Sequence, residues 1–158
     1  MSLTTPDTPT AGYITGKTHM LPIRIYYEDT DAGGIVYHAN YLRFAERGRT
    51  EMLRLLGVTQ KILFAETGLA FAVYKADLSY MKPAKHDDVV LVETALLELS
   101  GASMKVRQTM WRGTEGGENE KLVQFDGQIV CMNTQGRAAR IPALLRNAMA
   151  AYVTAEND

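Results

Sequence analysis

One short stretch of the chain combines side chains that could do chemistry with backbone that could assist them. Asp31 lies in an acidic loop, consecutive glycines follow at positions 33 and 34, and His38 comes just before a strongly periodic segment at 40–56. A carboxylate can act as a general base or as a nucleophile. A helix start offers unpaired N–H groups and the positive end of its dipole, which stabilise developing negative charge. The stretch therefore predicts an active site.

Residues 40–56 are expected to form the helix that positions this loop. Apolar side chains recur at intervals of three and four residues from Tyr41 onward, which predicts one buried face. Asn40 is a suitable N-cap, and Gly57 is a natural stop. Gly48 lies within the apolar face, where we expect a close approach to another backbone.

Residues 20–28 read as a strand that leads into the loop 29–39. Ile23, Ile25 and Tyr27 alternate with polar residues. This alternation predicts that Tyr27 points to the apolar side immediately before the loop. The glycine pair in the loop permits the sharp turn that brings the chain back to the helix.

The chain after the first helix predicts mostly strands. A short helix at 59–67, capped by Thr59, comes first, and Pro142 opens a short C-terminal helix that runs to Tyr152. Between them lie four alternating segments with hairpin signals at Ser100-Gly101 and Gly116-Gly117, namely 70–81, 88–99, 102–112 and 120–133.

These elements predict an α+β fold of one domain. One-sided strands and a helix with one apolar face must cover each other. We therefore expect an antiparallel sheet of about five strands, in antiparallel succession, wrapped around one long central helix. The domain is expected to cover 19–158, and residues 1–18, rich in Thr, Pro and Gly, to be a disordered tail.

Composition excludes several other classes of protein. The net charge of -1 gives no reason to expect nucleic acid or a membrane surface as a partner. Cys131 is the one cysteine, so no internal disulfide is possible, and its apolar surroundings predict a small buried hydrophobe. No secretory signal and no apolar run long enough to cross a bilayer are visible, so we expect a cytoplasmic protein.

The stretch YYEDTDAGGIVYHANYLRFAERGRTEMLR resembles the hotdog-fold acyl-CoA thioesterases, above all the branch associated with the Tol–Pal system. The 4-hydroxybenzoyl-CoA thioesterases are more distant relatives. The resemblance implies a sheet that wraps one long helix, hydrolysis of coenzyme A thioesters, and no cofactor. It also implies a homodimer with active sites at its interface, often paired into a homotetramer.

The resemblance also assigns roles to residues. Asp31 matches the catalytic carboxylate, as a general base or as a nucleophile that forms a mixed anhydride. His38 matches the position whose backbone N–H polarises the thioester carbonyl, and Tyr27 matches an active-site tyrosine. Substrate contacts are expected from Asn40, Gly34 and Tyr37.

Each of these residues also has a structural interpretation. Asp31 could cap a turn, and the His38 side chain could be a structural loop histidine. Tyr27 could be a core tyrosine with a satisfied hydroxyl group, and Asn40 could cap the helix rather than contact substrate.

Other chemistries remain as alternatives. Glu46 and Glu51 on the helix compete with Asp31, because another hotdog branch uses a helix glutamate. The loop from Asp29 departs too far from a calcium-binding loop, with Asn40 at the twelfth position, so we expect no metal. A hydratase would need its catalytic histidine on the helix, and His38 precedes it. A non-enzymatic partner of an envelope complex is the alternative from another class.

The sequence leaves the acyl group of the substrate open. Short, long or aromatic acyl-CoA, or an acyl carrier protein thioester, would all fit. The phosphates of coenzyme A need basic residues, and four are available without an assignment, namely Lys82, Lys85, Arg107 and Arg112.

Overall fold

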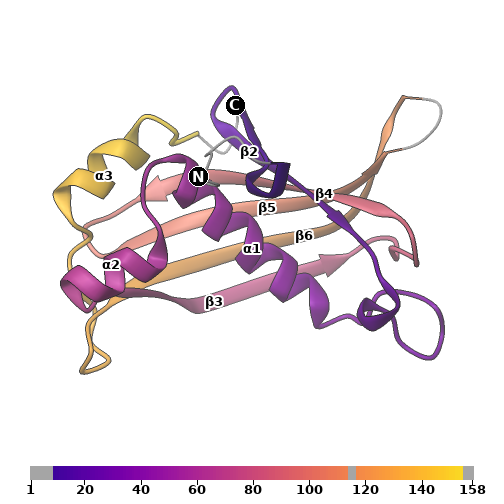
Figure 1. Ribbon diagram of the computed structural model, residues 1–158, viewed down its shortest axis with the longest axis horizontal. Coiled ribbons are helices and arrows are strands. Elements are labelled where there is room, and N and C mark those ends of the chain that lie inside the picture. The colour runs from indigo at the N-terminus through magenta and orange to yellow at the C-terminus, as the bar shows by residue number, and fades with distance from the viewer. Residues whose placement is uncertain (1–8, 114–116, 155–158) are drawn as a thin grey trace, which may run out of the picture.

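The structure is a computed structural model that describes residues 9–113 and 117–154. Within these residues an antiparallel six-stranded sheet curves around one long helix, α1, which spans Asn40–Leu55 (Figure 1). The strands are β1 (Tyr13–Thr15), β2 (Thr18–Arg24), β3 (Ala70–Tyr80), β4 (Val89–Leu99), β5 (Ser103–Gly113) and β6 (Asn119–Met132). The expected α+β hotdog fold is confirmed, with one strand more than expected.

The order of the strands differs from simple succession. It runs β1-β2-β4-β5-β6-β3, so β3 pairs with β6 and not with β4. The chain therefore leaves one side of the sheet after β2, crosses the concave face through α1, and enters the opposite edge as β3 (Figure 1). The expected succession holds only for β4, β5 and β6.

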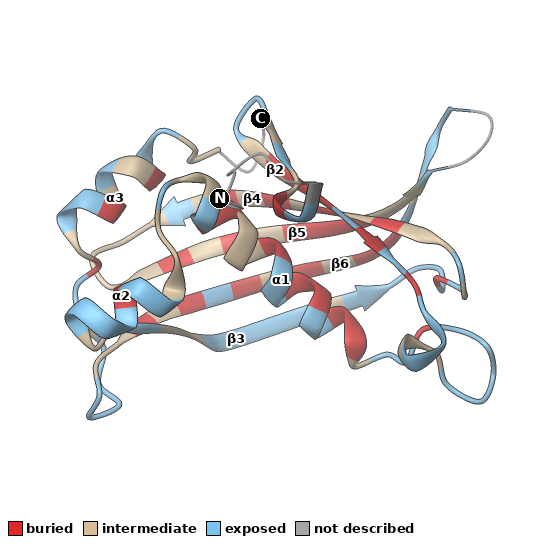
Figure 2. Cartoon of the chain, in the orientation of Figure 1, coloured by how far each residue is buried: buried red, intermediate tan, exposed pale blue. Residues whose placement is uncertain are grey.

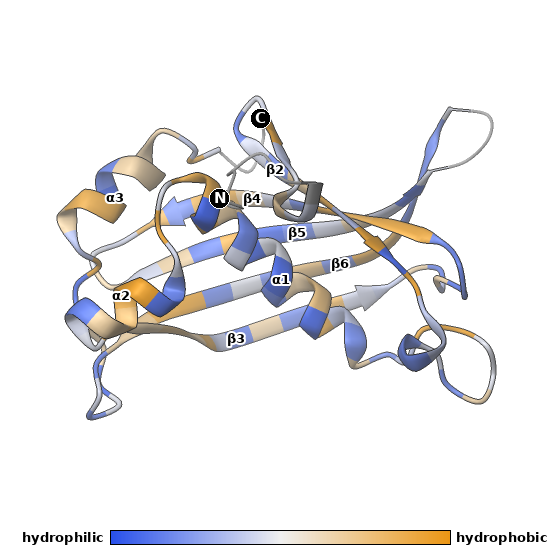
Figure 3. Cartoon of the chain, in the orientation of Figure 1, coloured by the Kyte–Doolittle hydropathy of each residue, from blue (hydrophilic) through white to orange (hydrophobic). Residues whose placement is uncertain are grey.

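The core lies between α1 and the sheet. Buried residues follow one face of α1 and the strands beneath it, whereas β3 and the loop before α1 are largely exposed (Figure 2). Hydrophilic and hydrophobic residues alternate along the strands, which gives the sheet one face for the core (Figure 3). The largest buried side chains of the contact include Phe44, Met110 and Phe125.

Gly48 marks the closest approach of α1 to the sheet. A Cβ atom added there would lie 2.9 Å from Val92 Cγ1, 2.9 Å from Gln108 Nε2 and 3.0 Å from Thr94 Oγ1. The predicted close approach exists, but the neighbours are side chains of β4 and β5, not another backbone. The polar part of this contact is a hydrogen bond from Gln108 Nε2 to the Ala45 carbonyl (2.8 Å).

The shorter helices lie at the end of the sheet remote from the loop (Figure 1). Helix α2 (Gln60–Thr67) has the predicted Thr59 cap, which accepts from the Ile62 N–H, and ends at Gly68 with a φ of 71°. Pro142 precedes α3 (Ala143–Ala150), as predicted. Burial of Cys131 raises the pKa of its thiol, in agreement with the predicted buried hydrophobe.

The predicted tail is wrong in its second half. Residues 9–11 form a 3-10 helix, η1 (Pro9–Ala11), and 13–15 form β1, which pairs with β2 as the sixth strand. Residues 1–8 of that tail, and Gly116 of the predicted hairpin, lie outside the described residues. Among the described helices, none is long and apolar enough to cross a membrane.

Candidate active site

The loop between β2 and α1 is held in place by its own backbone and by the segment before β4. Strand β2 ends at Arg24, earlier than predicted, and η2 (Tyr27–Asp29) follows. The Val36 N–H donates to the Ala84 carbonyl (2.9 Å), and the buried Val36 side chain anchors the loop in the core. The loop is thus a shaped element, although most of its side chains are exposed.

Asp31 sits at the tip of this loop with half of its carboxylate fixed. Its Oδ1 accepts the Gly33 N–H (2.8 Å), while Gly34, with a φ of 80°, donates its N–H to the Asp31 carbonyl (3.0 Å). Among the described residues, Oδ2 has no hydrogen-bond partner. The turn-capping interpretation and the catalytic one are therefore compatible, because one oxygen caps the turn and the other remains available.

The backbone before α1 offers unused donors. Neither the His38 N–H nor the Ala39 N–H has an acceptor among the described residues. The position of His38 is fixed from its other side, because Tyr80 Oη donates to the His38 carbonyl (3.0 Å). Two adjacent free amides at the positive end of a helix form a site for an oxyanion.

Tyr27 does not occupy the predicted position. Its side chain is 80% exposed and stacks on His86, with ring centroids 4.0 Å apart and planes at 22°. The prediction that it points to the apolar side is wrong, because β2 ends at Arg24 and the 3-10 turn breaks the alternation. The core-tyrosine interpretation is wrong for the same reason. No hydrogen bond joins Tyr27 to Asp31 within the described residues.

Asn40 is the first residue of α1 and not its cap. The cap position is Ala39, and the buried Asn40 side chain donates from Nδ2 to the Asp29 carbonyl (2.8 Å). It therefore ties the helix start to the loop instead of accepting a helix N–H. The Tyr37 N–H donates to the same Asp29 carbonyl (3.0 Å), which keeps the two segments together.

Two clefts flank the start of α1. One contains Asp31 and is lined by Glu28, Thr30, Asp31, Tyr37, Ala39, Asn40 and Arg43. The other includes His38 and is lined by Ile35, Val36, His38, Tyr41, Tyr80, Met81, Lys82 and Pro83. The structure thus brings Asp31, Tyr37 and Asn40 together, and leaves His38 and Tyr27 outside the lining of their cleft.

Sequence reasoning missed two residues of the Asp31 cleft. Ala39 lines it and has an N–H without an acceptor among the described residues, and Arg43 lines it with a positively charged side chain. Arg43 lies three positions after Asn40 and so shares its side of the helix, a spacing that could have revealed it. Ala39 carries no side-chain signal, because its contribution is a backbone group.

Comparison with known proteins identifies the family. A family model described as "Thioesterase-like superfamily" matches residues 26–149 of the chain. The chain belongs to this superfamily. The region that matches the family model begins at the loop before α1 and includes α1 and all four long strands.

Relatives and solved structures agree with this assignment. The chain is 52% identical over 93 residues to the "Acyl-CoA thioesterase YbgC" of Haemophilus influenzae, covering 59% of this chain and 68% of that protein. It is 42% identical over 112 residues to the "Acyl-CoA thioester hydrolase YbgC" of Escherichia coli O157:H7, covering 71% and 80%.

Among solved structures, a probable thioesterase from Bartonella henselae matches with a TM-score of 0.73 and 33% identity, over 79% of this chain and 99% of that one. The 4-hydroxybenzoyl CoA thioesterase from Pseudomonas sp. strain CBS-3 matches with a TM-score of 0.77 and 25% identity, over 83% and 98%.

The other charged candidates in this thioesterase-like chain are mostly engaged elsewhere. Arg112 donates to Asp88 (2.9 Å) and Glu120 (2.6 Å), and Lys82 also pairs with Glu120 (2.7 Å). These contacts raise the pKa of Arg112, with the Glu120 hydrogen bond first and the Asp88 hydrogen bond second.

Arg107 and the two helix glutamates have structural partners as well. Arg107 pairs with Asp126 on the sheet (2.7 Å), and Glu51 pairs with Arg54 (3.0 Å). Glu46 accepts from the Thr50 hydroxyl (2.9 Å). The contacts of Glu46 and Glu51 therefore give no reason to prefer a helix glutamate to Asp31 as the catalytic carboxylate.

Proposed function

We propose that this protein hydrolyses acyl-CoA thioesters with Asp31 as its catalytic carboxylate and the free amides of His38 and Ala39 as oxyanion donors. The observation that carries the proposal is the pair of adjacent N–H groups at the start of α1 that have no acceptor among the described residues. One of them belongs to Ala39, which lines the same cleft as Asp31, and Asp31 has one carboxylate oxygen that the Gly33 N–H does not hold. Thioester hydrolysis needs these two functions, a group that delivers the attacking oxygen and donors that stabilise the oxyanion.

The enzyme class rests on the family and on the relatives. Membership of the thioesterase-like superfamily, with acyl-CoA thioester hydrolases at 42% and 52% identity, confirms the expected acyl-CoA thioesterase. The assignment of the individual residues is supported by geometry alone.

The first step can follow two routes from the same carboxylate. As a general base, Asp31 takes a proton from water while the water oxygen bonds to the thioester carbon. As a nucleophile, its own oxygen bonds to that carbon and water later cleaves the anhydride. In both routes the C–S bond breaks, the thiolate leaves as coenzyme A, and the acyl group ends as a free acid.

The loop geometry limits what Asp31 must reorganise. The Gly33 N–H holds Oδ1, so the free Oδ2 is the atom that would face water or substrate. The carbonyl oxygen would accept from the amides at the helix start. Loss of one such donor costs roughly 3 kcal/mol of transition-state stabilisation. Because His38 acts through its backbone, replacement of its imidazole should have a smaller effect.

The edge strand β3 supports the expected dimer. Within the described residues β3 pairs only with β6, so its other edge is free along its length, and Val73 and Tyr74 are exposed there. A long free edge invites pairing with a second copy. Antiparallel pairing about a two-fold axis would set the Tyr80 end of β3, which contacts His38, beside the Ala70 end of the partner's β3.

The amide substitution at Asp31 tests the mechanism. Asp31→Asn keeps an oxygen for the Gly33 N–H but removes the charge, so release of free thiol from a panel of acyl-CoAs should fall by about 10²–10⁴-fold. Asp87→Asn is the matched control, because the Asp87 side chain is 82% exposed and its φ of 70° suits asparagine.

The outcomes separate the alternatives. Equal rates for the wild type and Asp31→Asn would reject the carboxylate mechanism. No turnover of any acyl-CoA or acyl carrier protein thioester would favour the non-enzymatic binding protein. Sedimentation is expected to give a dimer or tetramer, and a monomer with full activity at micromolar concentration would contradict an interface site.

A further inference from the structure

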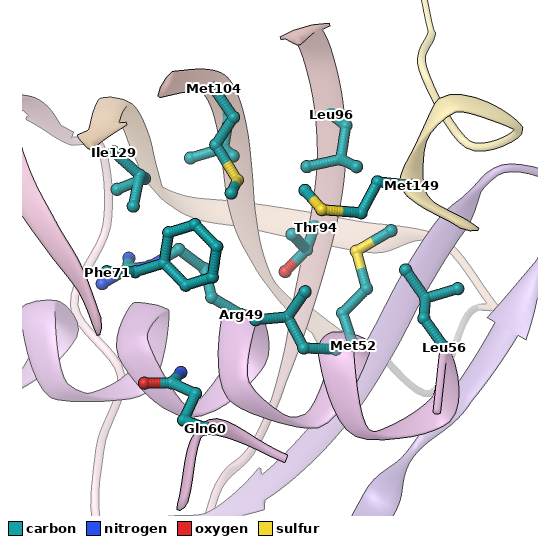
Figure 4. A pocket seen from close by; sticks show the side chains of 12 residues that line it. Arg49, Met52, Leu56, Gln60, Phe71, Thr94, Leu96, Met104, Ile129 and Met149 are labelled. Atoms are coloured by element: carbon teal, nitrogen blue, oxygen red, sulfur yellow. The ribbon is translucent and has the colours of Figure 1, made fainter. Parts of the chain in front are cut away.

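A second cavity lies away from the catalytic loop, beneath the C-terminal half of α1. It is lined by Arg49, Met52, Leu53, Leu56, Gln60, Phe71, Thr94, Leu96, Met104, Val106, Ile129 and Met149 (Figure 4). None of these residues lines either cleft at the start of α1. Arg49 follows Asn40 by nine positions, about 14 Å along a helix. The proposed catalysis therefore leaves this cavity without a role.

Arg49 gives the apolar cavity a single positive charge. Its Nη1 donates to Gln108 Oε1 (3.0 Å), and its Cζ lies 5.3 Å from the centre of the Phe125 ring. Within the described residues it has no carboxylate at ion-pair distance. Burial lowers the pKa of its guanidinium and Glu46 partly restores it, but an arginine remains charged.

The polar network around Arg49 holds it in place without neutralising it. Gln108 uses its Nε2 for the Ala45 carbonyl (2.8 Å) and the Thr94 hydroxyl (2.9 Å), so its Oε1 must face Arg49. A guanidinium has five N–H donors, and Gln108 satisfies one of them. A half-buried cation with spare donors beside an apolar cavity favours an anionic ligand with an apolar body.

The lining also limits the shape of that ligand. The space open to water-sized molecules measures about 30 Å³. With the side chains in the conformations of this structure, the cavity holds little more than water. Met52, Met104 and Met149 converge on it from α1, β5 and α3 (Figure 4). Methionine side chains adapt readily, so the cavity can open for a narrow unbranched chain more easily than for a rigid ring.

We propose that this cavity is a binding site for a short-chain aliphatic carboxylic acid, with the carboxylate on Arg49 and the chain among the three methionines. This is the chemical class of the free acid that acyl-CoA hydrolysis releases, so the choice of ligand rests on the proposed function. Binding itself needs no turnover, and the site is separate from Asp31.

Calorimetric titration with hexanoate tests the proposal directly. One hexanoate per protomer is expected, with binding about tenfold weaker for the neutral analogue hexanamide and for Arg49→Met, which lose a charge-assisted hydrogen bond. Arg49→Lys keeps the charge and should recover part of the affinity. Benzoate should bind more weakly than hexanoate. Equal binding of hexanoate and hexanamide by the wild type would overturn the proposal even if Arg49→Met failed to fold.

Methyl-labelled methionine locates the ligand. Hexanoate should shift the NMR signals of Met52, Met104 and Met149, whereas Met81 reports on the cleft beside His38. Asp31→Asn should bind hexanoate as the wild type does, even if that variant shows the proposed catalytic role to be wrong. A shift of Met81 alone, or loss of binding in Asp31→Asn, would place the acid in the active site and overturn the proposal.

Discussion

The start and the body of α1 belong to one helix but leave different groups unsatisfied. At the start, backbone amides of His38 and Ala39 have no acceptor among the described residues, and the surroundings are open to solvent. In the body, backbone groups are paired and Gly48 presses against side chains of the sheet. Packing of the helix body against the sheet therefore fixes the position of the N–H donors at the helix start.

This difference between the start and the body of α1 predicts that substitutions in the two regions impair different properties of the protein. At the exposed start, catalysis should suffer while the free energy of unfolding changes little. In the packed body, the free energy of unfolding should fall while the folded molecules remain active. Asp31→Asn, with its expected loss of about 10²–10⁴-fold in rate, is the largest effect of the first kind.

Gly48→Val should give the largest effect of the second kind. Its Cβ alone would meet Val92 at 2.9 Å, so the variant is overpacked and should lose about 1–3 kcal/mol of unfolding free energy. Urea denaturation measures this loss. Leu42→Val on the exposed side of α1 should change it by about 0.5 kcal/mol or less. A stable Gly48→Val protein that had lost its activity would contradict this difference between the two regions.

Tyr80→Phe tests the link between β3 and the helix start. It removes the hydrogen bond to the His38 carbonyl, worth about 0.5–1.5 kcal/mol, so kcat should fall by about tenfold at most. Tyr13→Phe on β1 is the control, because Tyr13 is half exposed and its hydroxyl has no partner among the described residues. Steady-state kinetics on one acyl-CoA compares the two, and equal kcat values would remove Tyr80 from the positioning of the amides.

A smaller effect is expected from the dependence of stability on pH, through the buried side chain of His19. Burial lowers the pKa of His19 below its ordinary 6.5, and its Nε2 contacts the Ala11 carbonyl (2.7 Å). The unfolded chain therefore binds a proton first as pH falls, so His19 contributes stability above pH 6.5 that is lost toward its folded pKa. His19→Gln should flatten the decline in melting temperature between pH 7 and 5. If the melting temperature of His19→Gln fell with pH as steeply as that of the wild type, titratable groups other than His19 would cause the decline.

The sequence was sufficient to predict the helix and strands whose hydrophobic pattern is set by packing against the core. The buried face of α1 and the four long strands follow from periodicities of 3.6 and 2, because the core needs those faces. The caps at Thr59 and Gly68 follow from local backbone chemistry. Asp31 was indicated by its place in an acidic loop before a helix start, the family motif then assigned its role, and that role stays a prediction.

The errors have physical causes. Strand β2, whose alternation placed Tyr27 in the core, ends at Arg24, and a 3-10 turn begins at Tyr27, a break that no side chain signals. Asn40 is a residue type that often caps helices, but here its side chain donates to the Asp29 carbonyl instead of accepting a helix N–H. Strand β1 is short and gains its stability from pairing with β2, so its own pattern is weak. The cavity at Arg49 depends on residues from seven elements, which no local pattern brings together.

The deep burial of Cys131 has a consequence for measurement. Since the raised pKa of its thiol and its lack of exposure keep it protonated and shielded, the folded enzyme should leave a thiol-reactive dye untouched. Colour that develops in a hydrolysis assay then counts liberated coenzyme A alone. Because an unfolded chain would add one reactive sulfur, the same dye without substrate reports the misfolded fraction of each variant.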